Sequence, residues 1–115
     1  MTSEKLYLPI ILGTTRPGRR SERVARYMLG YVQENLSDTV ETEIIDPRDF
    51  NLPLDGRDEH DSRYNELVNA ADGFYIVTPE YNHGYPGSLK RLLDSALKEY
   101  IHKPASIAGV SNGPW

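Results

Sequence analysis

Short apolar runs and longer amphipathic segments alternate along the chain. The apolar runs lie at residues 6–12, 40–46, 73–78 and 105–111. A short apolar run bounded by glycine, proline or polar residues favours a β-strand over a helix. Pro9 cannot donate to a sheet ladder, so we place it at the beginning of the first strand or at a bulge. The second run alternates loosely and ends before Pro47, which indicates an edge strand.

Three amphipathic segments lie between these runs. After Ser21, apolar residues recur at the three- and four-residue steps of one helical face, at positions 24, 25, 28, 29, 32 and 36. Ser21 is the expected N-cap of this helix. A shorter helix is predicted over residues 63–71 and a long amphipathic helix over residues 89–100. Residues 46–62 are acidic and interrupted by proline and glycine, which indicates a long surface loop.

The order of these elements predicts the fold class. Strands that alternate with helices are typical of an α/β protein with a doubly wound parallel sheet, here with four strands. No internal repeat or linker divides the chain, so residues 1–115 are predicted to form one domain. Ligands of open parallel sheets bind beyond the carboxyl ends of the strands. The loops that follow the strands are therefore the candidate site.

Composition narrows the class of protein. Apolar residues make up 38% of the chain and cysteine is absent, which excludes a collagen, a low-complexity tail and a disulfide-stapled mini-protein. The longest apolar run, near residues 8–12, is far shorter than the ~18 residues that span a bilayer, and the polar opening at residues 2–5 is not a signal peptide. We therefore expect a soluble, cytoplasmic chain without a membrane partner. The net charge of −4 disfavours nucleic-acid binding.

The first strand leads into a loop of glycines, hydroxyls and arginines, G-T-T-R-P-G-R-R-S over residues 13–21. At such a strand-to-helix turn, unpaired amides and the helix dipole point at one place and make an anion site. Arginines at positions 16, 19, 20, 23 and 26 crowd the start of the helix, where each cation opposes the dipole by roughly 0.3 to 1 kcal/mol. A bound phosphate would offset that cost. For Arg23 and Arg26, the alternative is a solvated basic helix face whose arginines pair with Glu22 or with acidic residues elsewhere.

Two common nucleotide motifs do not fit this loop. Gly13 and Gly18 have the spacing of a nucleotide-triphosphatase loop, but Arg19 and Arg20 replace its lysine and its magnesium-binding hydroxyl. The dinucleotide pattern G-x-G-x-x-G is also absent. The loop therefore suits a terminal phosphomonoester better than a pyrophosphate or a magnesium-bound triphosphate.

The third strand leads into a second loop, P-E-Y-N-H-G-Y-P-G over residues 79–87. Its backbone amides, tyrosines and Asn82 can lie along a flat heteroaromatic ring and hydrogen-bond to its edge. Tyrosines that only cover the core are the alternative. The three histidines, at positions 60, 83 and 102, have no ligand spacing, so no metal site is predicted.

These two loops, followed by S-N-G-P at residues 111–114, resemble the NADPH-dependent FMN reductase family, which includes quinone, azo-dye and chromate reductases. The resemblance implies a flavodoxin-like fold in which four strands are present and a fifth strand and last helix lie beyond the sequence. It also implies FMN and NADPH as cofactors, a small-molecule electron acceptor as partner, and a homodimer or higher homo-oligomer. The flavin carries the chemistry, so no catalytic acid or base is expected.

The resemblance also assigns binding residues, mostly through main-chain groups. The first loop would grip the FMN phosphate with Thr14, Arg16, Arg19 and Ser21. The second loop would hold the isoalloxazine ring with Pro79, Glu80, Tyr81, Asn82 and His83. The third loop would border the ring with Ser111, Asn112 and Gly113.

Two other functions remain open. One is an electron carrier that binds FMN without oxidising NADPH. Carriers of this fold tend to be acidic near the flavin, so an arginine-rich phosphate loop favours the enzyme. The other is a non-catalytic fragment that binds a partner through its uncovered surface.

Overall fold

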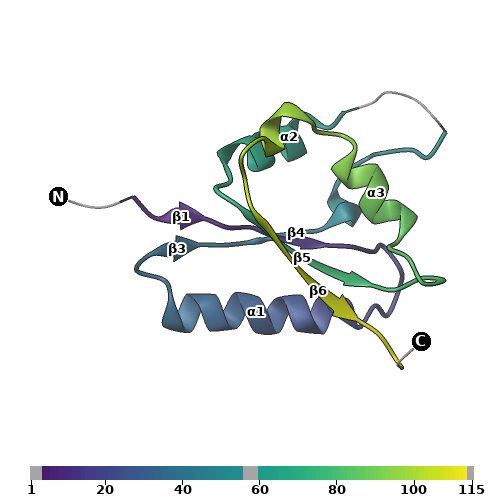
Figure 1. Cartoon of the computed structure of the whole chain (residues 1–115), viewed down its shortest axis with the longest axis horizontal. Helices are drawn as coiled ribbons and strands as arrows, with labels where there is room; N and C mark the ends of the chain where they lie inside the picture. Colours follow the sequence, from purple (N-terminus) through teal and green to yellow (C-terminus); the bar gives the residue numbers. More distant parts are fainter. Residues whose placement is uncertain (1–3, 56–59, 114–115) are drawn as a thin grey trace.

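The computed structural model describes residues 4–55 and 60–113 as a parallel sheet with helices on both faces (Figure 1). The main sheet has the order β4 (Ile44–Ile45), β2 (Ile10–Leu12), β5 (Phe74–Pro79) and β6 (Ala105–Val110). Each pair in it is parallel. This order confirms the predicted doubly wound α/β class. Predictions for residues 2–3, 56–59 and 114–115 lie outside the described residues.

The predicted first and second strands are each divided in two. β1 (Leu6–Tyr7) pairs with β3 (Val40–Glu41) in a separate two-stranded sheet, before β2 pairs with β4 in the main one. The first division falls at the buried Pro9, which has no N–H for the ladder. Beside it, the Leu8 carbonyl accepts a hydrogen bond from the Thr42 hydroxyl at 2.8 Å. The expected disturbance at Pro9 is confirmed, and β4 is the edge strand that the sequence predicted.

α1 (Ser21–Asn35) covers one face of the sheet (Figure 1). Its apolar stripe packs on β2 and β5 around a core of Ile10, Leu12, Ala25 and Val77, which confirms the predicted helical face. The predicted N-cap is wrong, because Ser21 is the first helical residue. Arg20 occupies the cap position and makes no side-chain cap hydrogen bond. The Ser21 hydroxyl is therefore not used for capping.

α2 (Ser62–Ala70) and α3 (Gly87–Leu93) cover the opposite face (Figure 1). α2 follows an N-cap at Asp61, whose carboxylate accepts the Arg63 amide at 3.0 Å, and it confirms the predicted helix over residues 63–71. The loop before it contains one short 3₁₀ helix, η1 (Pro47–Asp49), among the described residues. The core on this face includes Ile11, Ile45, Tyr64, Val68, Phe74, Ile76, Leu89 and Leu92. Alternate residues of β5 thus enter two cores, one on each face.

The predicted helix over residues 89–100 is wrong in its second half. α3 ends at Leu93, and a 3₁₀ helix, η2 (Lys98–Tyr100), follows after a turn. The Tyr100 hydroxyl donates to the Leu93 carbonyl at 2.8 Å, and its ring packs edge-on against Phe74 with centroids 5.6 Å apart. Leu97 points outward and is 78% exposed. The apolar residues at helical spacing therefore do not form one helix, and a turn after α3 brings Tyr100 onto the core.

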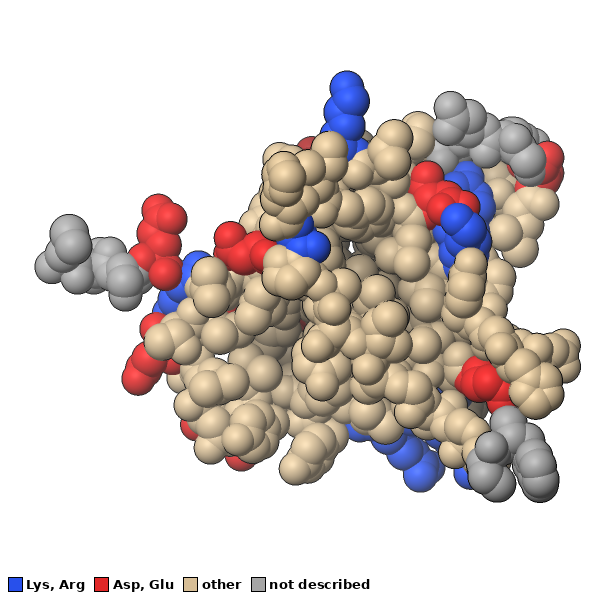
Figure 2. Space-filling view, in the orientation of Figure 1, with Lys and Arg blue, Asp and Glu red and all other residues tan. Residues whose placement is uncertain are grey.

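β6 is open along its outer edge in the part of the chain that the structure describes. Its side chains are exposed or half-buried, and Ile107 is 70% exposed although Ile76, its partner in the β5 ladder, is buried. On the α1 face, an apolar groove of about 630 Å³ lies beside the start of β6, lined by residues that include Tyr27, Tyr31, Tyr75 and Pro104. On the face drawn in Figure 2, most charged side chains lie toward the rim. No helix among the described residues is long and apolar enough to cross a membrane.

Candidate flavin-binding site

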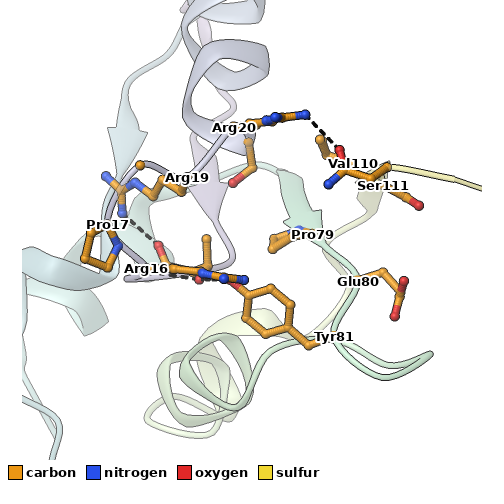
Figure 3. Close-up of a pocket in the computed structure, with 13 residues that line it drawn as sticks. Arg16, Pro17, Arg19, Arg20, Pro79, Glu80, Tyr81, Val110 and Ser111 are labelled. Carbon is orange, nitrogen blue, oxygen red and sulfur yellow. Dashed lines mark hydrogen bonds between the residues drawn. The ribbon is translucent and has the colours of Figure 1, made fainter.

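A cavity of about 410 Å³ lies at the carboxyl ends of β2, β5 and β6, where the loops after these strands meet (Figure 3). The predicted site residues that line it are Thr14, Arg16, Arg19, Ser21, Pro79, Glu80, Tyr81, Ser111 and Asn112. Pro17, Gly18, Arg20 and Val110 complete the lining. Three residues assigned from the resemblance, Asn82, His83 and Gly113, do not line it. The structure thus brings together three segments that are far apart in the sequence.

The first loop begins where two strand ends meet closely. A Cβ atom at Gly13 would lie 2.6 Å from the Thr78 hydroxyl oxygen of β5, so only glycine fits there. The Gly13 amide donates to the Val77 carbonyl at 2.8 Å, which fixes the point at which the loop leaves the sheet. Farther along, Gly18 has a φ of 67°, a left-handed conformation that favours glycine.

Two buried residues with hydroxyl side chains, Thr14 and Ser21, belong to this loop. Each is 2% exposed and lines the cavity. Thr14 Oγ1 lies 2.7 Å from the Tyr81 hydroxyl and accepts the Arg16 amide at 3.2 Å. Ser21 Oγ has no hydrogen-bond partner among the described residues. A buried hydroxyl without a partner is unusual in proteins, and this one lies in the first turn of a 15-residue helix, where an anion is favoured.

Arg19 lines the cavity, but its charge is engaged by the protein itself. Its buried guanidinium donates to the Thr14 carbonyl at 2.7 Å and to Glu22 at 2.8 Å, and it forms a bidentate pair with Asp46. Burial alone would raise the pKa of Asp46, but hydrogen bonds from Arg19 and from the Arg48 amide outweigh it and lower this pKa. Hydrogen bonds from Arg19 and Arg26 likewise lower the pKa of Glu22. The two carboxylates therefore balance Arg19, which holds the loop together.

Arg16 and Arg20 flank the cavity with exposed side chains. Figure 3 shows Arg16 reaching over the Tyr81 ring, whose centroid is 5.8 Å from the guanidinium carbon. Arg20 reaches toward the third loop and donates to Asn112 Oδ1 at 2.8 Å. Arg26 instead pairs with Glu22 at 3.2 Å on the helix surface, as the alternative interpretation of this residue predicted. Neither Arg23 nor Arg26 lines the cavity.

The second loop is a tight turn with strained backbone angles. Asn82 and His83 have φ values of 53° and 65°, and Tyr81 and Gly84 pair on either side of them, with N···O distances of 2.8 and 3.1 Å. The Glu80 carboxylate accepts the His83 amide and closes the turn. Asn82 and His83 therefore lie at the exposed tip of the loop, while residues 79–81 face the cavity.

The third loop closes the remaining side. Ser111 Oγ accepts the Gly113 amide at 3.2 Å and donates to the Gly113 carbonyl at 2.8 Å, so this loop also turns back on itself. Ser111 and Asn112 face the cavity. In residues 4–55 and 60–113, no group of three or more His, Cys, Asp or Glu side chains is placed to hold a metal ion.

Two residues that support the site were not identified from the sequence. Asp46 follows β4 and Arg48 lies in η1, and both contact the first loop from a distant part of the chain. Asp46 directly before Pro47 is a turn signal, since its carboxylate accepts the Arg48 amide at 3.0 Å. That signal predicts the turn but not the contact with Arg19.

The fold and the three loops at one sheet edge define a flavodoxin-like α/β protein. A solved structure titled as an NADH:FMN oxidoreductase in its apo form shares this fold, with a TM-score of 0.77 over 96% of this chain and 60% of that chain at 21% identity. The family model of the NADPH-dependent FMN reductases matches residues 8–115. The chain belongs to this family.

Two curated relatives show how the similarity is distributed. An NADPH azoreductase of Bacillus sp. (strain OY1-2) is 34% identical over an alignment of 113 residues, and the match covers 92% of this chain and 59% of that protein. A 2-hydroxy-1,4-benzoquinone reductase of Burkholderia sp. is 42% identical over an alignment of 74 residues, and the match covers 54% of this chain and 40% of that protein. The chain thus spans well under two thirds of the length of each relative.

Proposed function

We propose that this chain binds FMN in the cavity between its three loops and acts as an NADPH-dependent oxidoreductase that passes two electrons to a quinone-like or other small acceptor. The observation that carries the proposal is Ser21, which lines this cavity at the start of α1 and whose buried hydroxyl has no hydrogen-bond partner among the described residues. The exposed Arg16 and Arg20 flank the same cavity. This donor set suits a phosphate dianion, because a helix N-terminus, hydroxyls and guanidinium groups each stabilise negative charge.

The residues of the cavity take separate roles in this proposal. The hydroxyls of Thr14 and Ser21 and the guanidinium of Arg16 would hold the phosphate, and Arg19 would keep the loop in shape through Asp46 and Glu22. Residues 79–81 and 111–112 would border the ring, as the resemblance implies. The flavin supplies the hydride chemistry when bound, so the protein positions it and excludes competing reactions.

We infer the chemical class of the electron acceptor from the names of the relatives. The relatives include proteins named an NADPH azoreductase and a 2-hydroxy-1,4-benzoquinone reductase, and azo compounds and quinones are both conjugated molecules that are reduced in two-electron steps. With a quinone, NADPH and one proton would yield NADP⁺ and the hydroquinone, so electrons and protons balance. No side chain of this cavity is required as a proton donor in that balance, because the acceptor can take protons from water.

The test is a titration of the purified full chain with FMN, followed by anaerobic addition of NADPH. We expect a yellow protein whose flavin absorbance is bleached by NADPH and restored by a quinone. Bleaching only by a chemical reductant would indicate an electron carrier, and a chain that FMN does not colour would indicate a non-catalytic fragment. Ser21→Ala should weaken FMN binding, while Ser62→Ala, at the exposed start of α2, is the matched control.

A further inference from the structure

Two arginines hold the first loop through three consecutive backbone carbonyls. Arg19 donates to the carbonyl of Thr14 at 2.7 Å. Arg48 donates through Nε to the carbonyl of Thr15 at 3.1 Å and through Nη2 to that of Arg16 at 2.9 Å. Arg48 lies in η1 and does not line the cavity, so it contacts the loop without facing the space where a ligand would lie.

These contacts set the direction of the loop amides. In a trans peptide, a carbonyl and the following N–H point in opposite directions, so a held carbonyl fixes the next amide. The Thr15 carbonyl held by Arg48 therefore directs the Arg16 amide, which donates to Thr14 Oγ1 at 3.2 Å. If the Tyr81 hydroxyl donates to the same oxygen, both acceptor positions of Thr14 are filled. The Thr14 hydroxyl proton then has no acceptor among the described residues and is left for a ligand.

One carboxylate ties the two arginines together. Asp46 Oδ1 accepts from Arg19 at 2.9 Å and from the Arg48 amide at 3.0 Å. The turn after β4 thus holds two successive carbonyls of the loop after β2 directly, and it holds the Thr14 carbonyl only through Arg19.

We propose that Arg48 is a positioning residue for phosphate binding: it holds the carbonyls of Thr15 and Arg16 so that Thr14 presents a donor to the phosphate. The inference rests on the proposed function, because the ligand is the phosphate group of FMN. Among the described residues, the Arg48 guanidinium donates only to the carbonyls of Thr15 and Arg16, which lie in the loop assigned to the phosphate, so its effect should depend on whether the ligand carries a phosphate.

The experiment compares FMN with riboflavin, which lacks the phosphate, on the full chain and three variants. Arg48→Met removes both carbonyl contacts, and Arg48→Lys keeps the charge but has one donor group in place of the guanidinium fork. Arg63→Met is the matched control, because Arg63 is also exposed and donates to a backbone carbonyl, that of Asp49 at 2.6 Å, outside the cavity.

We expect Arg48→Met to raise the FMN dissociation constant about tenfold, the size of one or two lost hydrogen bonds. Riboflavin binding should change less than about twofold, Arg48→Lys should lie between, and Arg63→Met should match the unmodified chain.

A second measurement needs no flavin. The exchange rate of the Arg16 amide with water should rise in Arg48→Met and stay unchanged in Arg63→Met, because only the first change frees the Thr15 carbonyl. An unchanged Arg16 exchange rate, or equal losses of FMN and riboflavin affinity, overturns the role of Arg48. An unmodified chain that binds no FMN instead overturns the proposed function and the phosphate role with it, while the exchange rate still decides whether Arg48 holds the loop.

Discussion

β5 and β6 are neighbours of equal length, yet they contribute differently to the fold. Ile76 and Ile107 face each other in the ladder, and they are 8% and 70% exposed. β5 has a strand on each side and helices on both faces, whereas no described residue pairs with the outer edge of β6. The first two loops of the cavity leave β2 and β5, which are paired on both sides and so hold these loops in place. The third loop leaves an open edge.

The largest expected effect is a difference in the free energy of unfolding between alanine variants of these two isoleucines. Ile76→Ala should lower the free energy of unfolding by about 2 to 5 kcal/mol, because it leaves a cavity in the core. Ile107→Ala should change it by less than about 0.5 kcal/mol, as an exposed substitution does. Denaturation by urea measures both. If Ile107→Ala is as damaging as Ile76→Ala, another surface covers β6 in solution and the comparison fails.

The second prediction concerns the turn after β5. Asn82→Pro should weaken FMN binding by roughly a hundredfold or more, because proline fixes φ near −65° where Asn82 has 53°. Glu80→Gln should change affinity less than about threefold, since the amide oxygen can still accept the His83 amide. Titration of both variants with FMN decides between backbone and side-chain recognition. Equal losses would mean that the Glu80 charge itself is required.

The third prediction compares two arginines of the same segment. Arg16→Ala should weaken FMN binding by about 1.5 to 3 kcal/mol, the size of a charge-assisted hydrogen bond. Arg26→Ala should have little effect, because Arg26 lies outside the cavity and pairs with Glu22. The same flavin titration provides the measurement. Equal effects would refute the assignment of Arg16 to the phosphate.

The fourth prediction is a pH dependence of stability. The folded pKa of Asp46 is lower than its usual value, so its contribution to stability is present at neutral pH and is lost as the pH falls through the folded pKa. The free energy of unfolding should therefore decrease from about pH 5 downward. Asp46→Asn should flatten this dependence, and Asp49→Asn, on the exposed side of η1, should leave it in place. Parallel slopes in all three proteins would show that Asp46 does not govern the acid response.

The smallest expected effect is weak self-association through the open edge. Exposed backbone groups of an edge strand pair readily with another chain, and the apolar groove beside β6 adds surface to bury. Sedimentation should show species larger than a monomer that become fewer in Ile107→Glu. A monomer with a sharp unfolding transition at all concentrations would contradict this prediction.

Most of the fold could be predicted, because buried strands and helices produce local patterns of apolar residues in the sequence. The runs that became β2 and β5 are apolar on both faces, and the stripe of α1 repeats at helical spacing. The prediction of a helix over residues 89–100 was wrong because a local pattern can arise without a helix. Leu97 and Tyr100 have helical spacing in the sequence, but Tyr100 reaches Phe74 through a turn and a 3₁₀ helix.

The candidate site could be predicted only where residues that are close in the sequence form it. The loop after β2 could be recognised from its glycines and arginines, and the structure places most of it on one cavity. The sequence could not predict which arginine pairs within the protein and which stays exposed at the cavity. That difference depends on Asp46, which lies 27 residues from Arg19 in the sequence. For the same reason, the contacts of Arg48 with residues 15 and 16 had no signal in the sequence.

The pairing of Arg19 also determines how far the cavity can attract an anion. Two carboxylates neutralise this arginine, so the positive potential at the cavity comes mainly from Arg16 and Arg20. The whole chain carries a net charge of −4, and at physiological ionic strength the field of exposed groups fades over about 8 Å. A negatively charged flavin would therefore gain little from long-range electrostatic steering, and its association rate should depend only weakly on salt. Recognition would begin at contact with the loop.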